Sequence, residues 1–306
     1  MSGFAHPALF YRDPQEYLAG TVPFVRAGLA VGEPVAVAVP GPQLDLLADA
    51  LGPDVGRATL IDMGAAGRNP GRIIATVLHA FADQHPGRRT RIIGEPIWPG
   101  RTDTEYPACL QHEALINFAF ADRDVTILCP YDVTNLDKSV ISDAETTHPV
   151  LIDDTGERSS DRFDVAAALI AGNAPLPPRP RTTEVMFRAE TVRAARGYAV
   201  AQAQRSGMVE ARLVDVQLVV SELASNSIKH GGGSGSLWVW RDQHHLVCEV
   251  RDAGVFADPL AGRAPVSSDK HGGRGLLLVH RLADLIRIHT TPDATTVRAY
   301  LHLDPG

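Results

Sequence analysis

The sequence predicts an α/β domain followed by an α+β domain. The chain has 306 residues, and a single domain usually takes roughly 100 to 200 residues. Amphipathic helical segments alternate with short β-branched runs up to about residue 172, whereas helices and hairpins are mixed beyond residue 183. Four prolines lie between these regions: Pro175, Pro177, Pro178 and Pro180. We therefore expect domains at 1–172 and 183–306, joined by a proline-rich linker at 173–182.

The first domain shows repeated rounds of helix and strand. Apolar spacing predicts helices at 16–29, 43–51, 72–82 and 105–120, and strands at 34–39, 58–62, 91–94 and 125–129. Strands separated by helices of this length are joined by crossovers, which favours a parallel sheet with helices on its faces, as in RecA-like and Rossmann-like folds. Ligands of such sheets bind beyond the carboxyl ends of the strands.

The linker and the second domain follow a different order. A proline-rich stretch forms neither a helix nor an inner strand, so residues 173–182 should be an extended spacer. Beyond it we expect strands at 186–189, 236–241, 246–252, 284–290 and 295–303, with helices at 191–204, 209–229 and 276–282. Helices mixed with antiparallel hairpins are typical of an α+β domain.

Composition and charge exclude several classes of protein. Apolar residues make up 44% of the chain and charged residues 21%, which is typical of a globular protein. The formal net charge is −7, without long runs of one sign. Proteins that bind nucleic acid regardless of sequence need clustered Lys and Arg, so we expect no direct nucleic-acid partner.

The cysteines and the first residues of the chain indicate the cellular compartment in which the protein is expected. Cys109, Cys129 and Cys248 are widely spaced inside apolar runs, a pattern that predicts neither a disulfide framework nor a zinc site. No basic segment precedes an apolar stretch at the start, and no window has the roughly 18 consecutive apolar residues of a membrane helix. We expect a cytoplasmic protein without a membrane partner.

Polar residues recur on one face of the predicted helix 209–229. Glu222 and Asn226 are four residues apart, and Lys229 with His230 follows one turn later. Such a face is also typical of a solvated surface. Alternatively, an Asn amide oxygen suits Mg²⁺ held mainly by phosphates and water, and a Glu one turn away can take a proton from a hydroxyl.

A carboxylate ends the predicted strand 246–252. Alternation places Asp252 on the same face as Leu246, Cys248 and Val250. A buried acceptor at a strand end suits the exocyclic amine of adenine, and Gly254 lets the backbone approach a planar base closely. A plain turn after a strand is the alternative interpretation.

Glycines precede the predicted helix 276–282. Gly272, Gly273 and Gly275 surround Arg274, immediately before Leu276. Glycines at a helix entry free backbone N–H groups to point at an anion, and the helix dipole adds to the attraction. Loop flexibility is the alternative reason for such a turn.

These segments, taken in order, resemble the sequence boxes of the GHKL ATPases. The segments are 222–226 with 229–231, then 252–254, then 272–276, followed by the pair Thr295 and Thr296. The short Glu-x-x-x-Asn box and the Gly-Arg-Gly-Leu motif are most similar to the anti-sigma-factor serine/threonine kinases. The resemblance implies a GHKL (Bergerat) fold that binds ATP with Mg²⁺.

The resemblance also implies roles for single residues. Asn226 helps bind Mg²⁺, and Glu222 acts as the base or orients a water molecule. Asp252 recognises adenine, and Gly254 forms the floor of the base pocket. The same boxes contain Lys229, His230 and Leu276, the lid glycines Gly273 and Gly275 with Arg274, and Thr296, expected near Asp252. Asp293 and Ala294 stand before the Thr pair where the family often has a glycine.

A second set of polar and aromatic residues lies near strand ends of the first domain. It comprises His6, Tyr11, Glu95, Trp98, Glu113, Tyr131 and Asp132. We expect the carboxylates Glu95, Glu113 and Asp132 near one rim of the sheet, where a ligand pocket forms. Ordinary packing also explains Trp98 and Tyr131.

Residues 6–135 resemble the MEDS sensory domain. The similar segments are 10–11, 28–33, 113–117 and the sequence Cys129-Pro130-Tyr131-Asp132. The resemblance implies a domain that senses a small organic compound. The glycines at 64–67 lack the Gly-Lys-Ser/Thr ending of a phosphate loop, so this half should not bind nucleotide.

Together these features predict a bacterial regulator of signal transduction and transcription. In it a sensor domain controls an ATP-dependent serine kinase whose partner is a sigma factor or an anti-sigma antagonist. One alternative is a binding module that uses ATP without transferring phosphate. The other, a sensor histidine kinase, needs an acceptor His before the ATP domain, and residues 173–190 contain none. The sequence leaves the oligomeric state open, a homodimer included.

Overall fold

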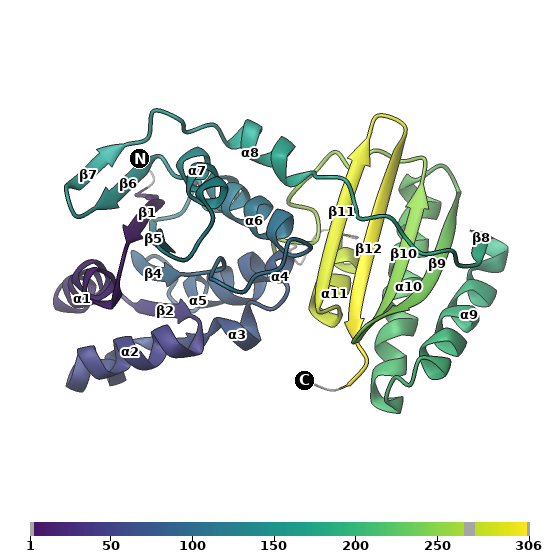
Figure 1. Cartoon of the computed structure of the whole chain (residues 1–306), viewed down its shortest axis with the longest axis horizontal. Helices are drawn as coiled ribbons and strands as arrows, with labels where there is room; N and C mark the ends of the chain where they lie inside the picture. The colour runs from purple at the N-terminus through teal and green to yellow at the C-terminus, as the bar shows by residue number, and fades with distance from the viewer. Residues whose placement is uncertain (1–2, 266–272, 305–306) are drawn as a thin grey trace. The chain divides into compact units, whose positions relative to one another are not determined.

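The computed structural model describes residues 3–265 and 273–304. The chain divides into two compact units, with the boundary between Gly172 and Asn173. Figure 1 shows the helices and strands of both units. Each unit is described by itself.

Unit 1 is built on a seven-stranded sheet with the order β3-β2-β4-β5-β1-β6-β7. All neighbouring strands are parallel except β6 and β7, which pair antiparallel at one edge. The strands are β1 (Pro7–Tyr11), β2 (Val35–Val39), β3 (Thr59–Asp62), β4 (Thr90–Gly94), β5 (Val125–Asp132), β6 (Val150–Asp153) and β7 (Gly156–Ser159). The predicted α/β class with a parallel sheet is confirmed, although β1, β6 and β7 were not expected.

Helices connect these strands. They are α1 (Pro14–Ala30), α2 (Gly41–Leu51), α3 (Met63–Ala66), α4 (Pro70–Ile73), α5 (His79–Ala82), α6 (Tyr106–Ala119), α7 (Lys138–Thr147) and α8 (Val165–Gly172). A 3-10 turn at Gly52–Arg57 follows α2, and a π-helical turn at Ile74–Leu78 joins α4 to α5. Asp13 caps α1 by accepting a hydrogen bond from the backbone of Glu16. All of β2 is buried, which explains its continuous apolar run.

Unit 2 contains a five-stranded antiparallel sheet with the order β11-β12-β10-β9-β8. The strands are β8 (Glu184–Arg188), β9 (Ser234–Asp242), β10 (His245–Asp252), β11 (Leu285–Thr291) and β12 (Ala294–His302). A 3-10 turn at Ala189–Thr191 leads into α9 (Val192–Arg205), which is followed by α10 (Glu210–His230) and α11 (Arg274–Leu282). This arrangement confirms the predicted α+β class.

The core of unit 2 lies between the helices and one face of its sheet. Ala195, Ala199 and Ala203 of α9 pack in one cluster with Val216 and Val220 of α10. The sheet contributes alternate residues to that cluster: Leu237, Val239, Leu246, Cys248, Val250, Ala299 and Leu301. Small alanines on α9 allow the helix to approach closely, and the alternation gives the sheet a helix-covered face and an outer face.

The proline-rich segment lies along the outer face of this sheet, as Figure 1 shows. Asn173 exchanges hydrogen bonds with the backbone of Thr290, and Thr182 donates to the carbonyl of Val239. The Arg179 guanidinium stacks 3.9 Å from the ring centre of Trp238. The segment expected to be a spacer is therefore a strap across β11 to β9, because its side chains find partners on the sheet.

The strap covers a buried ion pair. The Glu249 side chain on β10 is 2% exposed and accepts a 2.7 Å hydrogen bond from Nε of Arg298 on β12. Arg179 of the strap reaches the other carboxylate oxygen at 3.0 Å. Charged groups are rarely buried unless they are paired, so the strap and this pair stabilise each other.

No helix within residues 3–265 and 273–304 combines the length and the apolar character required to cross a membrane.

Candidate functional site

Four segments of unit 2 converge on one cavity of about 350 Å³. They are the C-terminal half of α10, the end of β10 with the loop after it, the start of α11 and the start of β12. Among the residues singled out from the sequence, those lining the cavity are Asn226, His230, Asp252, Gly254, Gly273, Gly275, Leu276 and Thr295. The motifs that follow one another along the chain thus lie close together in space, around one cavity.

Asp252 occupies the end of β10 at the cavity wall. Its Oδ2 accepts a 2.6 Å hydrogen bond from the Ser227 hydroxyl, and its Oδ1 accepts a 2.9 Å bond from the backbone N–H of Gly254. A carboxylate has about four acceptor positions, so two remain for a ligand. The two existing bonds fix the orientation of the carboxylate before any ligand arrives.

Two glycines make room around Asp252. A Cβ on Gly254 would lie 2.6 Å from the carbonyl oxygen of His230, and a Cβ on Gly231 would lie 2.3 Å from the carboxyl carbon of Asp252. Gly273, before α11, has φ +79°, a left-handed conformation that favours glycine. Larger residues at 231 and 254 would displace the Asp252 carboxylate or the loop that follows it.

Glu222 lies one turn before Asn226 on α10, beside the start of α11. A Cβ on Gly275 would lie 2.3 Å from Oε2 of Glu222, so only glycine leaves the carboxylate its present place. Asn226 lines the cavity, whereas Glu222 borders it through Gly275. Helical spacing predicted that the two side chains share one face of α10, and on this face Glu222 lies beside Gly275 while Asn226 lines the cavity.

The structure places some expected residues elsewhere. Lys229 and Arg274 do not line the cavity. Thr296 was expected near Asp252, but the residue opposite Asp252 on β12 is Thr295, which lines the cavity and donates a 2.8 Å hydrogen bond to the Gly254 carbonyl. Since side chains alternate along a strand, Thr296 faces the outer side of the sheet. Gly272 lies outside the described residues.

Sequence reasoning missed several contributors to the cavity, among them Ser227, Phe256 and Gly262. Ser227 holds Asp252, Phe256 supplies an aromatic wall, and Gly262 lines the loop between β10 and α11. Ser227 directly follows Asn226 on the face that meets β10, so helical spacing could have indicated it. Phe256 and Gly262 follow the Asp-Ala-Gly turn in a segment without regular periodicity, which offered no such signal.

The residues predicted for a sensory pocket in unit 1 form two groups. Tyr11 and Asp132, at the ends of β1 and β5, line a cavity of about 280 Å³ together with Tyr17. Glu95 follows β4 and is fully buried; burial, reinforced by the charge of Asp132, raises its pKa well above the usual value. This first group lies at the carboxyl ends of parallel strands, as expected.

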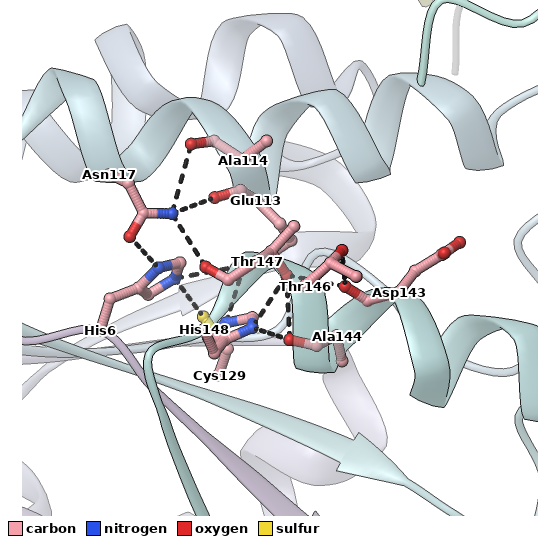
Figure 2. Close-up of polar contacts among 10 residues, drawn as sticks. All are labelled: His6, Glu113, Ala114, Asn117, Cys129, Asp143, Ala144, Thr146, Thr147 and His148. Carbon is pink, nitrogen blue, oxygen red and sulfur yellow. Dashed lines mark hydrogen bonds and ion pairs between the residues drawn. The ribbon is translucent and has the colours of Figure 1, made fainter. Parts of the chain in front are cut away.

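The second group lies within the core of unit 1 and is shown in Figure 2. Oε2 of Glu113 is 3.3 Å from Nε2 of His6 and 3.2 Å from Nε2 of His148. Cys129 Sγ lies 3.4 Å from His6 Nε2. Burial lowers the pKa of His6 to about 4 and raises that of Cys129. The expectation that Glu113 shares a rim with Asp132 is corrected, because its carboxylate points at the two imidazoles.

Two further residues of that prediction have packing roles. The Tyr131 ring meets His148 edge-on, with ring centres 5.5 Å apart. Trp98 is covered by the Arg101 guanidinium at 3.7 Å and does not line the 280 Å³ cavity. His148 was not singled out from the sequence, because it stands between Thr147 and Pro149 without a motif around it.

Comparisons with known families agree with this division. Residues 5–149 match the model of the MEDS family, described as the methanogen/methylotroph, DcmR sensory domain. Residues 185–301 match the histidine kinase-like ATPase domain. The chain joins a MEDS domain to a histidine kinase-like ATPase domain. Among curated proteins, no sequence match was found.

Solved structures resemble parts of the chain. The RsbU and RsbW domains of Rv1364c from Mycobacterium tuberculosis are 16% identical with a TM-score of 0.31, covering 42% of this chain and 34% of that one. The Acinetobacter baumannii histidine kinase AdeS is 12% identical with a TM-score of 0.25, covering 41% of this chain and 70% of that one. The chain thus spans about a third of the Mycobacterium structure.

The cavity of the ATPase domain fits the ligand that this class of domain implies. Its volume lies within the roughly 300–1,000 Å³ typical of small-molecule sites. Val250, Phe256 and Val297 offer apolar walls for a planar base, and Asp252 offers an acceptor at their edge. ATP binding follows from the domain class; the individual residue roles are our proposal.

We expect Asp252→Asn to weaken ATP binding about 10- to 100-fold, because one acceptor facing the adenine amine becomes a donor and a charge-assisted hydrogen bond is worth about 1.5–3 kcal/mol. Isothermal titration with ATP and Mg²⁺ measures this effect. Asp258→Asn, in the loop that also lines the cavity, is the matched control. Equal ATP affinity in the Asp252 variant and the wild type would refute the assignment.

Proposed function

We propose that this chain is a signalling regulator in which the MEDS domain controls an ATP- and Mg²⁺-dependent serine kinase. The substrate is a protein partner of the sigma-factor or anti-sigma-antagonist type, and a small organic ligand at the MEDS domain sets the activity. Transfer of the γ-phosphoryl group is the chemistry that bound ATP supplies. Catalysis in this class depends on positioning and charge neutralisation.

The observation that carries the proposal is the position of Glu222. Its carboxylate lies beside Gly275, and Gly275 lines the cavity together with Asn226. A carboxylate there can take the proton from an attacking serine hydroxyl, while Asn226 offers its amide oxygen to the metal. Asp252 and the apolar residues that line the cavity hold the adenine base of ATP.

A module that binds ATP without transferring phosphate would need the same Asp252 and Asn226 but no base. The presence of Glu222 at the glycine-rich helix start favours the kinase. The histidine-kinase alternative is not favoured, because residues 173–183 run as an extended strap on the ATPase sheet and carry no acceptor His.

The experiment that tests the proposal is capture of partners from bacterial extract on the immobilised full chain, with and without ATP. We expect ATP-dependent capture and phosphoserine, detected by mass spectrometry, on a captured protein. Capture that requires ATP without any phosphoserine would instead support the binding module. Phosphohistidine on this chain would support the histidine kinase.

A further inference from the structure

We propose that His6, Glu113, Cys129 and His148 bind one Zn²⁺ ion inside the MEDS domain. Each residue offers one ligand atom, and the four atoms lie within 4.8 Å of one another. Zn²⁺ prefers four ligands from Cys, His and carboxylate side chains, in a tetrahedron. The wide spacing of the cysteines argued against a zinc site with several cysteine ligands. The proposed site uses only one cysteine, so this spacing does not bear on it.

The separations within this cluster, defined by those four residues, suit a shared ion. Zinc–ligand distances of about 2.0–2.3 Å place tetrahedral ligand atoms about 3.3–3.8 Å apart. The measured separations are 3.2 and 3.3 Å from Glu113 to the two imidazoles, and 3.4 Å from Cys129 to His6. The remaining pairs of ligand atoms lie within 4.8 Å, so the side chains would have to move closer together to complete the tetrahedron.

The tautomer of His148 exposes a lone pair to the cluster. Its Nδ1 lies 2.9 Å from the carbonyl oxygen of Ala144, so Nδ1 carries the proton and donates it there. In the neutral ring, Nε2 then has a lone pair that faces the Glu113 carboxylate at 3.2 Å. These two groups attract each other only when a proton or a metal cation lies between them.

Asn117 orients His6 in the same way. Its amide nitrogen donates to the backbone carbonyl of Thr147 at 2.9 Å and to those of Glu113 and Ala114 at 3.3 Å. This fixes its oxygen 3.3 Å from Nδ1 of His6, which leaves Nε2 of His6 for the cluster (Figure 2). Such outer partners are typical of metal-binding histidines.

Charge and burial complete the argument. All four residues are at most 1% exposed, and Oε2 of Glu113 faces the imidazoles of both His6 and His148. A divalent cation bound to the Glu113 carboxylate and a Cys129 thiolate is electrically neutral, with one proton released from the thiol to solvent. An ionised carboxylate at this depth needs a cationic partner, which a metal ion or a protonated imidazole can supply.

The ion would tie together four segments that are distant in the sequence. His6 precedes β1, Glu113 lies on α6, Cys129 on β5, and His148 directly follows α7. With four protein ligands and no exposed face, the coordination is that of a closed, structural site. The inference does not depend on the proposed kinase activity, because it concerns the other domain.

The test uses the tag-free full chain, stripped with a chelator and titrated with Co²⁺ as a spectroscopic substitute for Zn²⁺. We expect one Co²⁺ per chain, with visible bands of tetrahedral coordination and a thiolate charge-transfer band in the near ultraviolet. Cys129→Ala should lose the thiolate band, whereas Cys248→Ala, a buried cysteine of the other unit, should keep it.

Asn117→Ala is a second test that leaves all four ligands in place. We expect its Zn²⁺ affinity, measured by competition with a chelating dye, to fall about 10- to 100-fold. Absence of Co²⁺ binding by the folded wild-type chain would overturn the proposal. So would an unchanged Co²⁺ spectrum in Cys129→Ala.

Discussion

Replacing Glu222 by Gln should lower the rate of phosphate transfer about 100- to 10,000-fold, the range typical of a lost general base. The substitution keeps the shape of the side chain beside Gly275, so the start of α11 should not move. ATP contacts elsewhere in the cavity are untouched, and the ATP affinity should stay within about twofold. The measurement is the initial rate of labelled phosphate transfer to the partner captured by the wild-type chain.

Glu210→Gln is the matched control for this prediction. Glu210 is an exposed glutamate in the first turn of the same helix, far from the cavity residues along α10. Its variant should transfer phosphate at the wild-type rate. If Glu222→Gln transferred phosphate as fast as this control, Glu222 would not be the base.

Replacing Glu249 by Ala should destabilise the ATPase domain by about 3–5 kcal/mol, because it leaves a buried cation without its partner. The remaining Arg298 is 4% exposed and has its guanidinium packed between Glu249 and the ring of Trp240. Urea unfolding monitored by tryptophan fluorescence measures the effect. A Trp98→Phe background restricts the signal to Trp238 and Trp240, both in the ATPase domain.

Two further variants separate charge from packing. Glu184→Ala removes an exposed glutamate of the same sheet and should cost below about 1 kcal/mol. The double variant Glu249→Met with Arg298→Met should recover most of the lost stability, since apolar residues of similar volume often replace buried ion pairs at little cost. Equal stability of Glu249→Ala and Glu184→Ala would show that the ion pair under the strap contributes nothing.

Local sequence patterns predicted the helices and strands in which apolar residues recur at regular spacing. Helical spacing over 209–229 and alternation over 246–252 indicated which faces carry Asn226 and Asp252, which line the cavity, because the periods of 3.6 and 2 fix which side chains share a face. Thr296 shows the limit of this reasoning. Two adjacent threonines satisfy the same motif, and only the register with β10 decides that Thr295 faces the cavity.

Features that depend on strand order were not predictable from the sequence. β1 pairs with both β5 and β6, and this brings His6 close to His148 although 142 positions separate them. No local sequence pattern predicts that His6 and His148 lie close together. The strap was missed for a related reason: prolines predict an extended chain, but not that Asn173, Arg179 and Thr182 find partners on a sheet formed later in the sequence.

The most direct test of the central claim, an adenine-specific ATP site in the cavity between α10, β10 and α11, is titration calorimetry of the full chain with ATP and with GTP in Mg²⁺. We expect one ATP per chain, and a GTP affinity about 10- to 100-fold lower, because the guanine base presents an acceptor where Asp252 requires a donor. Equal affinity for the two nucleotides, or no binding of ATP, would contradict the account.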